Sequence, residues 1–459
     1  MWDLKIIDTD QSLYVAIADA MERDIQLGIL KGGERMPTHR ELARIVGVNV
    51  TTITRAYKEA EKRGLITSTV GRGTFVTSDL GKSASLYRDE TQEGRLIELG
   101  LVLPLHTVEP DIGDVIGRIL KKGRLNQYMG YTPPNGLARH REVGSAWIRR
   151  FGVGADAETT VVTAGVQHAL ICVFSALFQP GDRVAVDQLT YPGVKAAAKR
   201  CGIHLEGVPV DLEGMLPKEL ESLCKRTDIK GVYTVSTMEN PTNSAMSEQR
   251  MNAIAAIIEK RDLLLIEDDI YRFMSASGPA PLSTLIPERS VYLAGVSKAF
   301  YAGLRVGFLC APKRLCGRIA QAVVDTMWMA PSLNAEIVCT CIEEGIADEI
   351  IARKIGEIRE RAAIAESVLD GYEYRYEKDS MFLWLRLPDE QAAAEFEKSA
   401  AGFGVNIVSS EKFAVGGSVP PNYIRISLSG AENRKELHKG LTVIQRLLDG
   451  EIGSPEGIL

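Results

Sequence analysis

A lysine and an arginine near residue 300 have types and spacing suited to chemistry. The apolar run 291–294 leads into Gly-Val-Ser297-Lys298, and a Gly-Leu-Arg-Val-Gly block places Arg305 seven residues after the lysine. We expect a buried strand to deliver Lys298 to a cleft and Arg305 to return to the same place. A lysine whose pKa is lowered by burial can act as an amine nucleophile and form a Schiff base. Ser297 and Arg305 are suited to holding a phosphate, although the motif alone also fits an ordinary surface Ser-Lys.

A second candidate is a carboxylate at the end of an all-apolar run. Residues 263–266 are Leu-Leu-Leu-Ile, and Glu-Asp268-Asp-Ile-Tyr271 follows. A carboxylate buried there is costly unless a cation pairs with it, and a protonated pyridine nitrogen is such a cation. Asp268 and Tyr271 would then hold opposite edges of that ring, with Tyr271 donating to the ring oxygen. The alternative is a solvated acidic loop end.

Three further motifs follow predicted strands. Gly165-Val166-Gln167 opens a predicted helix, and amides at a helix N-terminus bind phosphate; a plain strand-to-helix turn is the alternative. Tyr191, in Tyr-Pro-Gly, is placed to lay an aromatic face on a flat cofactor, although such a motif is more often a turn. Asn240, in Asn-Pro, offers an amide to a phenolate oxygen.

The elements that position these motifs follow from the pattern after Leu96. Runs rich in β-branched residues alternate with helical stretches, for which we predict helices over 167–178, 193–201 and 247–260. This alternation predicts an α/β domain with a mostly parallel sheet covered by helices. Ligands bind at the carboxyl ends of the strands in such a sheet, which is where the motifs lie.

The first eighty residues have a different pattern. Leu13, Ile17, Met21 and Ile25 recur every four residues and predict an amphipathic helix. Thr38 to Glu41 predicts a capping box at the start of a second helix that stops at Gly47. A third helix is expected from near Val50, with Ile53, Ala56, Tyr57 and Ala60 buried. Two short helices around a glycine-containing turn predict a helix-turn-helix.

Charge and outward residues favour DNA as the ligand of this unit. The net charge of the chain is −6, but residues 31–72 hold nine basic and four acidic side chains, a local +5. The outward positions of the third helix are Thr51, Thr52, Thr54, Arg55 and Lys58. Residues 65–76 predict a hairpin with a basic tip at Arg72.

These residues resemble the winged helix-turn-helix of the GntR family of bacterial regulators. The resemblance lies in MPTHRELARIVGVN and GLITSTVGRGTFV. The residues that match the family's motif, and for which it implies DNA contacts, are Thr38, Arg40, Thr52, Arg72 and Gly73. Thr51 and Arg55 are expected DNA contacts because they lie on the outward face of the third helix. This chain departs from the family by having Val50 and Thr54 at two positions where the family often places arginine. The alternative is a helix-turn-helix used only for protein contacts.

The order Gly-x-Gln, Tyr, Asn-Pro, Asp-x-x-Tyr, Ser-Lys, Arg resembles the fold-type I aminotransferases over about residues 96–450. The resemblance implies that Lys298 carries pyridoxal phosphate as an aldimine, that Asp268 keeps the ring nitrogen protonated, and that Asn240 and Tyr271 bind the ring oxygen, with Tyr191 stacked on the ring. It assigns the phosphate to these residues: Gly165, Val166, Gln167, Ser297 and Arg305.

Two further assignments come from the same resemblance. Arg425, in Asn-Tyr-Ile-Arg-Ile-Ser, matches the arginine that clamps a substrate carboxylate, and Tyr131 matches a tyrosine that reaches the phosphate of the partner subunit. The chain departs from the family by lacking one phosphate hydroxyl, since Gly295 stands in the Ser-x-Ser-Lys motif. It also has Asn243 in place of the glycine of Asn-Pro-x-Gly.

The joined architecture resembles the MocR subfamily of regulators. We expect a winged helix-turn-helix over 1–78, a linker over 79–95 and an aminotransferase-like domain over 96–459, with a smaller α+β subdomain of about 320–459 plus about 96–130. The resemblance implies a head-to-tail homodimer. The seven cysteines show no CxxC pairing, so we expect reduced thiols in a cytoplasmic protein, without a signal peptide or membrane span. Cys339 and Cys341 fit helix core packing better than a metal site.

Two functions remain open at this point. In the first, an amine or amino-acid effector displaces Lys298 to form an external aldimine, and the resulting shift between two states changes operator binding. In the second, the chain is a working aminotransferase that acts on an amino acid and a 2-oxo acid, since all catalytic groups are present. A DNA-binding protein with a cofactor-free domain is a third reading, and it requires Lys298 and Asp268 to coincide by chance.

Overall fold

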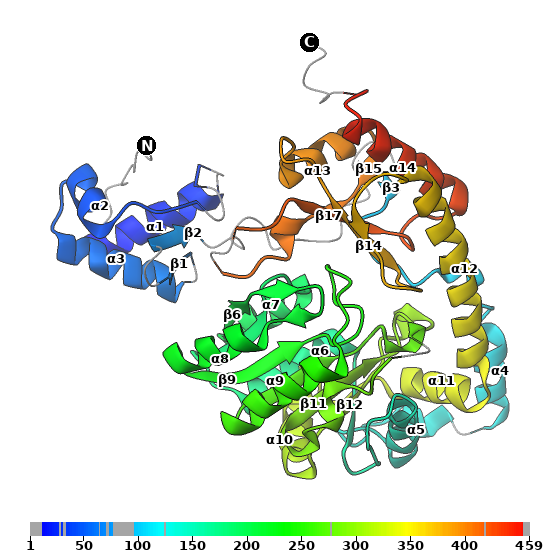
Figure 1. Ribbon diagram of the computed structural model, residues 1–459. Helices are drawn as coiled ribbons and strands as arrows, with labels where there is room; N and C mark the ends of the chain where they lie inside the picture. Colours follow the sequence, from blue (N-terminus) through cyan, green and yellow to red (C-terminus); the bar gives the residue numbers. More distant parts are fainter. Residues whose placement is uncertain are drawn as a thin grey trace.

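The computed structural model describes residues 12–26, 29–30, 34–63, 65–69, 73–76, 96–123, 125–275, 278–416 and 419–452. The predicted linker and Arg72 lie outside these residues. Within them, an N-terminal helix-turn-helix unit precedes an α/β body with a large mixed sheet and a smaller antiparallel sheet (Figure 1). This confirms the predicted fold class.

The N-terminal unit contains α1 (Leu13–Gln26), α2 (His39–Val46), α3 (Val50–Lys62), β1 (Ile66–Thr69) and β2 (Gly73–Val76). The capping box is present, because Thr38 N donates to Glu41 Oε2 at 2.8 Å and Glu41 N donates to Thr38 Oγ1 at 3.3 Å. Gly47 ends α2 with φ of 73°, a left-handed conformation that glycine adopts at no steric cost. The four α3 residues predicted to be inward are buried, and β1 pairs antiparallel with β2.

The large sheet has seven strands. Their spatial order is β4 (Thr160–Thr163), β12 (Gly307–Cys310), β11 (Ser290–Gly295), β10 (Leu264–Asp268), β9 (Ile229–Thr234), β5 (Arg183–Asp187) and β6 (His204–Val208). β12 runs antiparallel to both of its neighbours, and the other pairs are parallel. The predicted mostly parallel sheet is confirmed, and its strand ends lie where the motifs were found.

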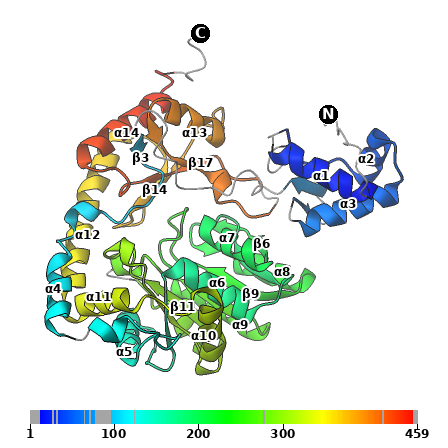
Figure 2. The ribbon, with the colours of Figure 1, turned by 180° about the vertical axis from the view of Figure 1, so that it is seen from behind.

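Helices cover this sheet on both faces, as Figure 2 shows from behind. They are α5 (Ala138–Arg149), α6 (Val166–Leu177), α7 (Pro192–Cys201), α8 (Pro217–Arg226), α9 (Glu248–Lys260) and α10 (Lys313–Met327). α6, α7 and α9 begin within one residue of the predicted positions. Apolar strand residues such as Val161, Val184 and Ile266 are fully buried between the layers, and this burial supplies the main stabilisation of the layered body.

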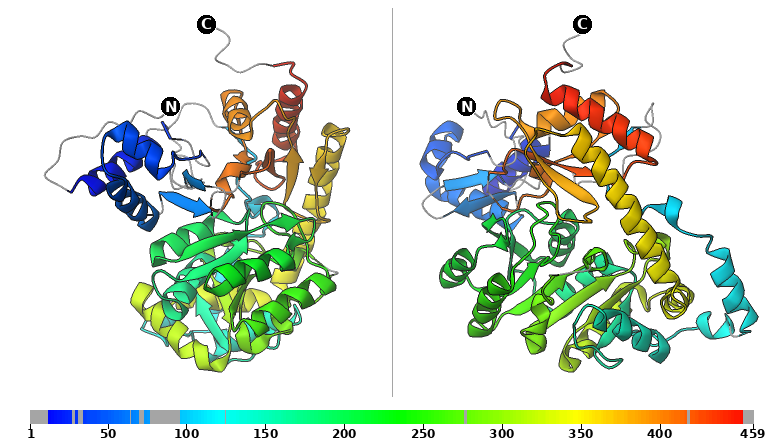
Figure 3. Two further views of the ribbon diagram at one scale, coloured as in Figure 1. Left: turned by 60° about the vertical axis from the view of Figure 1, so that its left-hand side comes forward. Right: turned by 45° about the vertical axis from the view of Figure 1, so that its right-hand side comes forward.

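The second sheet has four antiparallel strands in the order β13 (Tyr374–Arg375), β14 (Phe382–Arg386), β17 (Tyr423–Ser427) and β16 (Val408–Ser409). Beside it lie a pair formed by β3 (Ile97–Glu98) and β15 (Val405–Asn406), and the helices α13 (Ala393–Gly402) and α14 (Arg434–Leu448). The long α12 (Ile346–Val368) runs from this region down to α4 (Gly113–Lys121) and α11 (Ser332–Glu343) (Figure 3). A short hairpin of β7 (Val210–Asp211) and β8 (Gly214–Met215) completes the strands of the described residues.

The cysteines are all free thiols. Cys339 and Cys341 are buried on α11, so the prediction of core packing on a helix is confirmed. Among the described residues, no helix combines the length and the apolar composition that crossing a membrane requires.

Candidate functional site

Lys298 lies three residues after the last residue of β11, so a buried strand leads to it as predicted. Its Nζ donates to the backbone oxygen of Val102 at 2.5 Å. Burial, together with the positive charges of Arg425, Arg305 and Lys354, lowers the pKa of Lys298 to about 8. A substantial fraction of this amine is therefore neutral near neutral pH, which is the form that attacks a carbonyl carbon.

Asp268 ends the neighbouring parallel strand β10 and is almost completely buried. Its Oδ2 accepts a hydrogen bond from Tyr233 Oη at 3.0 Å, whereas its Oδ1 is buried without a hydrogen-bond partner. Burial raises the pKa of Asp268 to about 7, although the Tyr233 hydrogen bond opposes this change. A buried carboxylate oxygen without a partner is costly, and a protonated ring nitrogen would satisfy it.

The predicted phosphate residues lie close together at the start of α6. Gly165 precedes the helix with φ of 82°, and a side chain there would begin 2.6 Å from Arg305 Nη2. Arg305 Nη1 donates to Ser297 Oγ at 3.0 Å. Gln167 Nε2 donates to the Gly193 oxygen at 2.9 Å. The helix N-terminus, a hydroxyl and a guanidinium therefore converge as an anion site requires.

Arg425 lies on β17 of the small sheet and is buried beside Asn240. Its Nη1 donates to Asn240 Oδ1 at 2.7 Å, its Nη2 donates to the Gly100 oxygen, and its Nε has no partner. The guanidinium carbon lies 5.0 Å from the centre of the Phe413 ring. Burial lowers the pKa of Arg425 and raises that of Tyr271, which is buried nearby. A buried guanidinium with an unused donor is suited to receive a carboxylate.

Of the two predicted tyrosines Tyr191 and Tyr131, only Tyr191 lies near the other site residues. Tyr191 immediately precedes α7 and is partly buried, and its hydroxyl is close enough to Arg425 and Tyr271 to affect their pKa values. Tyr131 is 84% exposed and lies beside Trp328, with 5.6 Å between the ring centres. Within one chain the structure does not bring Tyr131 to the other predicted residues.

The residues present fit pyridoxal phosphate. The Asp268 Oδ1 atom is buried and unpartnered, which suits the ring nitrogen. The close approach of Gly165 to Arg305 leaves backbone amides free of side-chain cover, which suits the phosphate. The amine of Lys298, with its lowered pKa, suits the aldehyde carbon.

Sequence reasoning missed several residues at this site. Tyr233 was not singled out, because nothing in its strand shows that its hydroxyl reaches a neighbouring strand. Lys354 on α12 was also missed: its Nζ donates to Glu109 Oε1 at 2.7 Å and to the Lys298 oxygen at 3.3 Å. The only available signal was a lysine at an inward position of a helix, which is uncommon.

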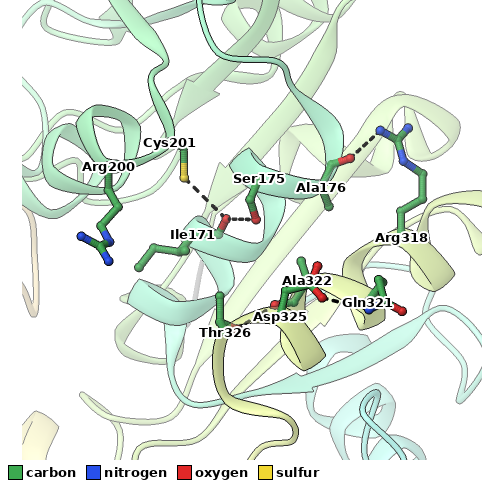
Figure 4. A pocket seen from close by; sticks show the side chains of 10 residues that line it. All are labelled: Ile171, Ser175, Ala176, Arg200, Cys201, Arg318, Gln321, Ala322, Asp325 and Thr326. Carbon is green, nitrogen blue, oxygen red and sulfur yellow. Dashed lines mark hydrogen bonds between the residues drawn. The ribbon is translucent and has the colours of Figure 1, made fainter.

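A surface pocket lies elsewhere on the large domain, between α6, α7 and α10 (Figure 4). It is lined by Ile171, Ser175, Ala176, Arg200, Cys201, Arg318, Gln321, Ala322, Asp325 and Thr326. No predicted site residue belongs to it. The residues predicted to bind the cofactor, at the strand ends, therefore lie outside this surface pocket.

The predicted DNA contacts are mostly exposed on one unit. Arg40, Thr51 and Arg55 are exposed at α2 and α3, and Thr52 is partly buried. The Thr38 hydroxyl is engaged as the helix cap. Gly73 opens β2 with φ of 116°, and a side chain there would meet Arg35 Nε at 3.0 Å. Arg72 lies outside the described residues.

Two family models match this chain. The model for aminotransferase class I and II matches residues 108–444, and the model for bacterial regulatory proteins of the gntR family matches residues 13–76. The chain therefore belongs to the aminotransferase class I and II family and carries a GntR-type helix-turn-helix at its N-terminal side. This agrees with the MocR resemblance of the sequence.

Known proteins with both parts, or with the second part alone, are similar to this chain. The HTH-type transcriptional regulator YdeF of Bacillus subtilis is 30% identical over 448 residues, which cover 98% of this chain and 97% of YdeF. The mitochondrial kynurenine/alpha-aminoadipate aminotransferase of Mus musculus is 29% identical over 66% of this chain and 79% of its own length. The crystal structure of an archaeal alanine:glyoxylate aminotransferase covers 86% of this chain and all of that one, with a TM-score of 0.74 and 25% identity.

Proposed function

We propose that this protein is a DNA-binding transcriptional regulator whose aminotransferase-like domain binds pyridoxal phosphate at Lys298 and senses an amine or amino acid. The observation that carries the proposal is the joining, in one chain, of an exposed basic recognition helix and a buried lysine–carboxylate–arginine site. A catalytic domain alone does not require α3 with Arg55 on its outer face. The similarity to YdeF over nearly the whole chain supports the same reading.

Pyridoxal phosphate, when bound, supplies a carbonyl group for amines and an electron sink. The Lys298 amine would bind it covalently, and the ionised Asp268 would hold the ring nitrogen in its protonated form. Asn240 and Tyr271 would bind the ring oxygen, and Tyr191 would lie against the ring face.

The anionic ends of cofactor and effector would be held by separate groups. Backbone amides of Gly165, Val166 and Gln167 would hold the phosphate together with Ser297 and Arg305. Arg425 would bind an effector carboxylate through two parallel hydrogen bonds.

Assembly and domain boundaries belong to the same proposal. We infer a head-to-tail homodimer in which Tyr131 of one chain reaches the phosphate site of the other. Its exposure of 84% leaves it available for such a contact. We place the DNA reader at residues 1–78, the linker at 79–95 and the sensor at 96–459.

The test is operator binding by the purified protein with and without pyridoxal phosphate and a panel of amino acids. The operator is first selected from random DNA. We expect the cofactor together with one class of amine to change the dissociation constant for DNA, and Lys298→Ala to abolish that response while DNA binding survives. A folded Lys298→Ala variant that has lost all DNA affinity would show that the two functions are not separable as proposed.

The competing function is distinguished in the same preparation. Rapid amino transfer to 2-oxoglutarate, together with DNA binding that no amine changes, would favour a working aminotransferase over a sensor.

A further inference from the structure

Residues 98–102, here called the strap, cross from the small sheet to the site. Leu99 N donates to the Asn406 oxygen at 2.9 Å, and Ser427 N donates to the Leu99 oxygen at 2.7 Å. The Glu98 side chain clamps the turn that follows, because its Oε1 accepts from Gly100 N at 2.6 Å and from Leu101 N at 2.7 Å. The strap is therefore attached to β15 and β17 and held in shape by one carboxylate.

The Gly100 oxygen of the strap occupies one of the two positions at which a carboxylate would bind Arg425. It accepts from Arg425 Nη2, while the adjacent Arg425 Nε is buried without a partner. Nε and Nη2 form one edge of a guanidinium, and a carboxylate binds such an edge with both oxygens. The other edge is engaged by Asn240 through Nη1. A carboxylate that binds along this edge must take the position of the Gly100 oxygen.

The Val102 oxygen of the strap occupies the amine of Lys298. It accepts from Lys298 Nζ at 2.5 Å. An amine that forms a covalent bond to a carbonyl carbon cannot keep this hydrogen bond as an ammonium donor. Two carbonyl groups, two residues apart, therefore hold the two cations that the proposed function assigns to cofactor and effector.

We propose that the strap is an internal ligand that occupies Arg425 and Lys298 until an amino-acid carboxylate and the cofactor displace it. This inference rests on the proposed function and names its regulatory element. A neutral carbonyl is a weaker acceptor for a guanidinium than a carboxylate is, so the exchange favours the ligand. The strap begins three residues after the predicted linker, so its release alters the attachment point of the DNA reader.

Hydrogen–deuterium exchange of the full-length protein tests the displacement. The probe is phosphopyridoxyl-L-alanine, a stable conjugate that carries the ring, the phosphate and a carboxylate. We expect its binding to speed exchange in the peptide that covers residues 96–103, because a released strap loses the hydrogen bond from Leu99 N to the Asn406 oxygen. Ligand binding commonly slows exchange near a site, so the sign of the change is diagnostic.

A matched set of variants tests the competition. Glu98→Ala removes the clamp, and we expect it to tighten probe binding by about tenfold, the equivalent of one hydrogen bond. Glu98→Gln keeps an acceptor oxygen and removes only the charge, so we expect a smaller change. Glu395→Ala, an exposed carboxylate on α13, is the control and should leave probe affinity unchanged.

The two proposals fail in different ways. Probe binding with unchanged or slower exchange at residues 96–103, or equal affinity in Glu98→Ala and Glu395→Ala, would overturn the strap alone. Failure of the wild-type protein to bind the probe at all would overturn the proposed cofactor site and the strap with it.

Discussion

At the scale of the residue, the proposed cofactor chemistry depends on Asp268 and Lys298. Burial moves both pKa values toward neutrality, to about 7 for the carboxyl and about 8 for the amine. In the cofactor-free protein, burial therefore disfavours the charged form of each of these two groups. Asp268 would pair with the ring nitrogen of pyridoxal phosphate and Lys298 with its aldehyde carbon, so we expect cofactor binding to relieve both penalties.

Asp268→Asn should stabilise the cofactor-free protein more at pH 8 than at pH 5. The folded pKa is raised from 3.8 to about 7, so the folded state binds the proton more tightly and stability falls as pH rises through this window. Each pH unit between the two pKa values is worth about 1.4 kcal/mol. Urea unfolding at both pH values measures the difference.

Asp269→Asn is the matched control for this prediction. Asp269 is also buried, and burial raises its pKa to about 8, although a 3.0 Å hydrogen bond from Tyr292 Oη to Asp269 Oδ2 opposes this change. It should show a similar pH-dependent stabilisation but keep its affinity for pyridoxal phosphate, which Asp268→Asn should lose. Equal cofactor affinity in the two variants would contradict the role given to Asp268.

At the scale of the element, α12 contacts the backbone of Lys298 through Lys354. Lys354 is fully buried, pairs with Glu109 at 2.7 Å and bonds the Lys298 backbone. Glu109 also accepts from Tyr301 N at 2.9 Å. These contacts join α12, the segment after the strap and the loop that carries Lys298 into one buried polar network.

Lys354→Met should raise the pH at which the protein captures pyridoxal phosphate. Lys354 is one of the positive charges that lower the pKa of Lys298, so its removal leaves less neutral amine at a given pH. The rate of appearance of the visible absorbance, followed from pH 6 to pH 9, measures this midpoint. Lys354→Arg keeps the charge and should leave the midpoint near the wild-type value; a midpoint unmoved in Lys354→Met would exclude the electrostatic role.

The recognition helix α3 is the corresponding element of the DNA reader. Arg55→Ala should weaken operator binding and lower the slope of log affinity against log salt by about one, since one phosphate contact is lost. Arg200→Ala, at an exposed position of α7, removes the same charge far along the chain and should not change the slope. Identical salt titrations for the two variants would contradict the docking of α3.

The features that could be predicted from the sequence are those that depend on residues close together in the chain. The starts of α6, α7 and α9 and the capping box at Thr38 were predicted within a residue, because hydrophobic periodicity and capping depend on near neighbours. Lys298 and Asp268 were singled out by residue type at the end of an apolar run, and Arg425 by the family resemblance. The oxygens of Gly100 and Val102 were not, because a backbone carbonyl has no residue-type signal. Lys354 and Glu109 are 245 residues apart, and only the fold brings them together.

At the scale of the whole molecule, the strap begins three residues after the predicted linker that joins the proposed DNA reader to the proposed sensor. The network from Arg425 through Gly100 to Glu98 includes residues close in sequence to residue 96, where the described part of the body begins. On the proposed function, ligand binding at the strand ends would change the attachment of the reader without any contact between ligand and DNA. A ligand achieves this only by binding one arrangement of the strap better than the other.

The central claim is a covalent bond between Lys298 and pyridoxal phosphate, and borohydride reduction followed by peptide mass spectrometry tests it most directly. We predict that the purified protein is yellow with added cofactor and that reduction fixes the cofactor on the peptide that contains Lys298. Lys298→Ala should stay colourless and unlabelled. A colourless wild-type protein, or label on Lys195 or Lys354, which are both buried, would contradict the account.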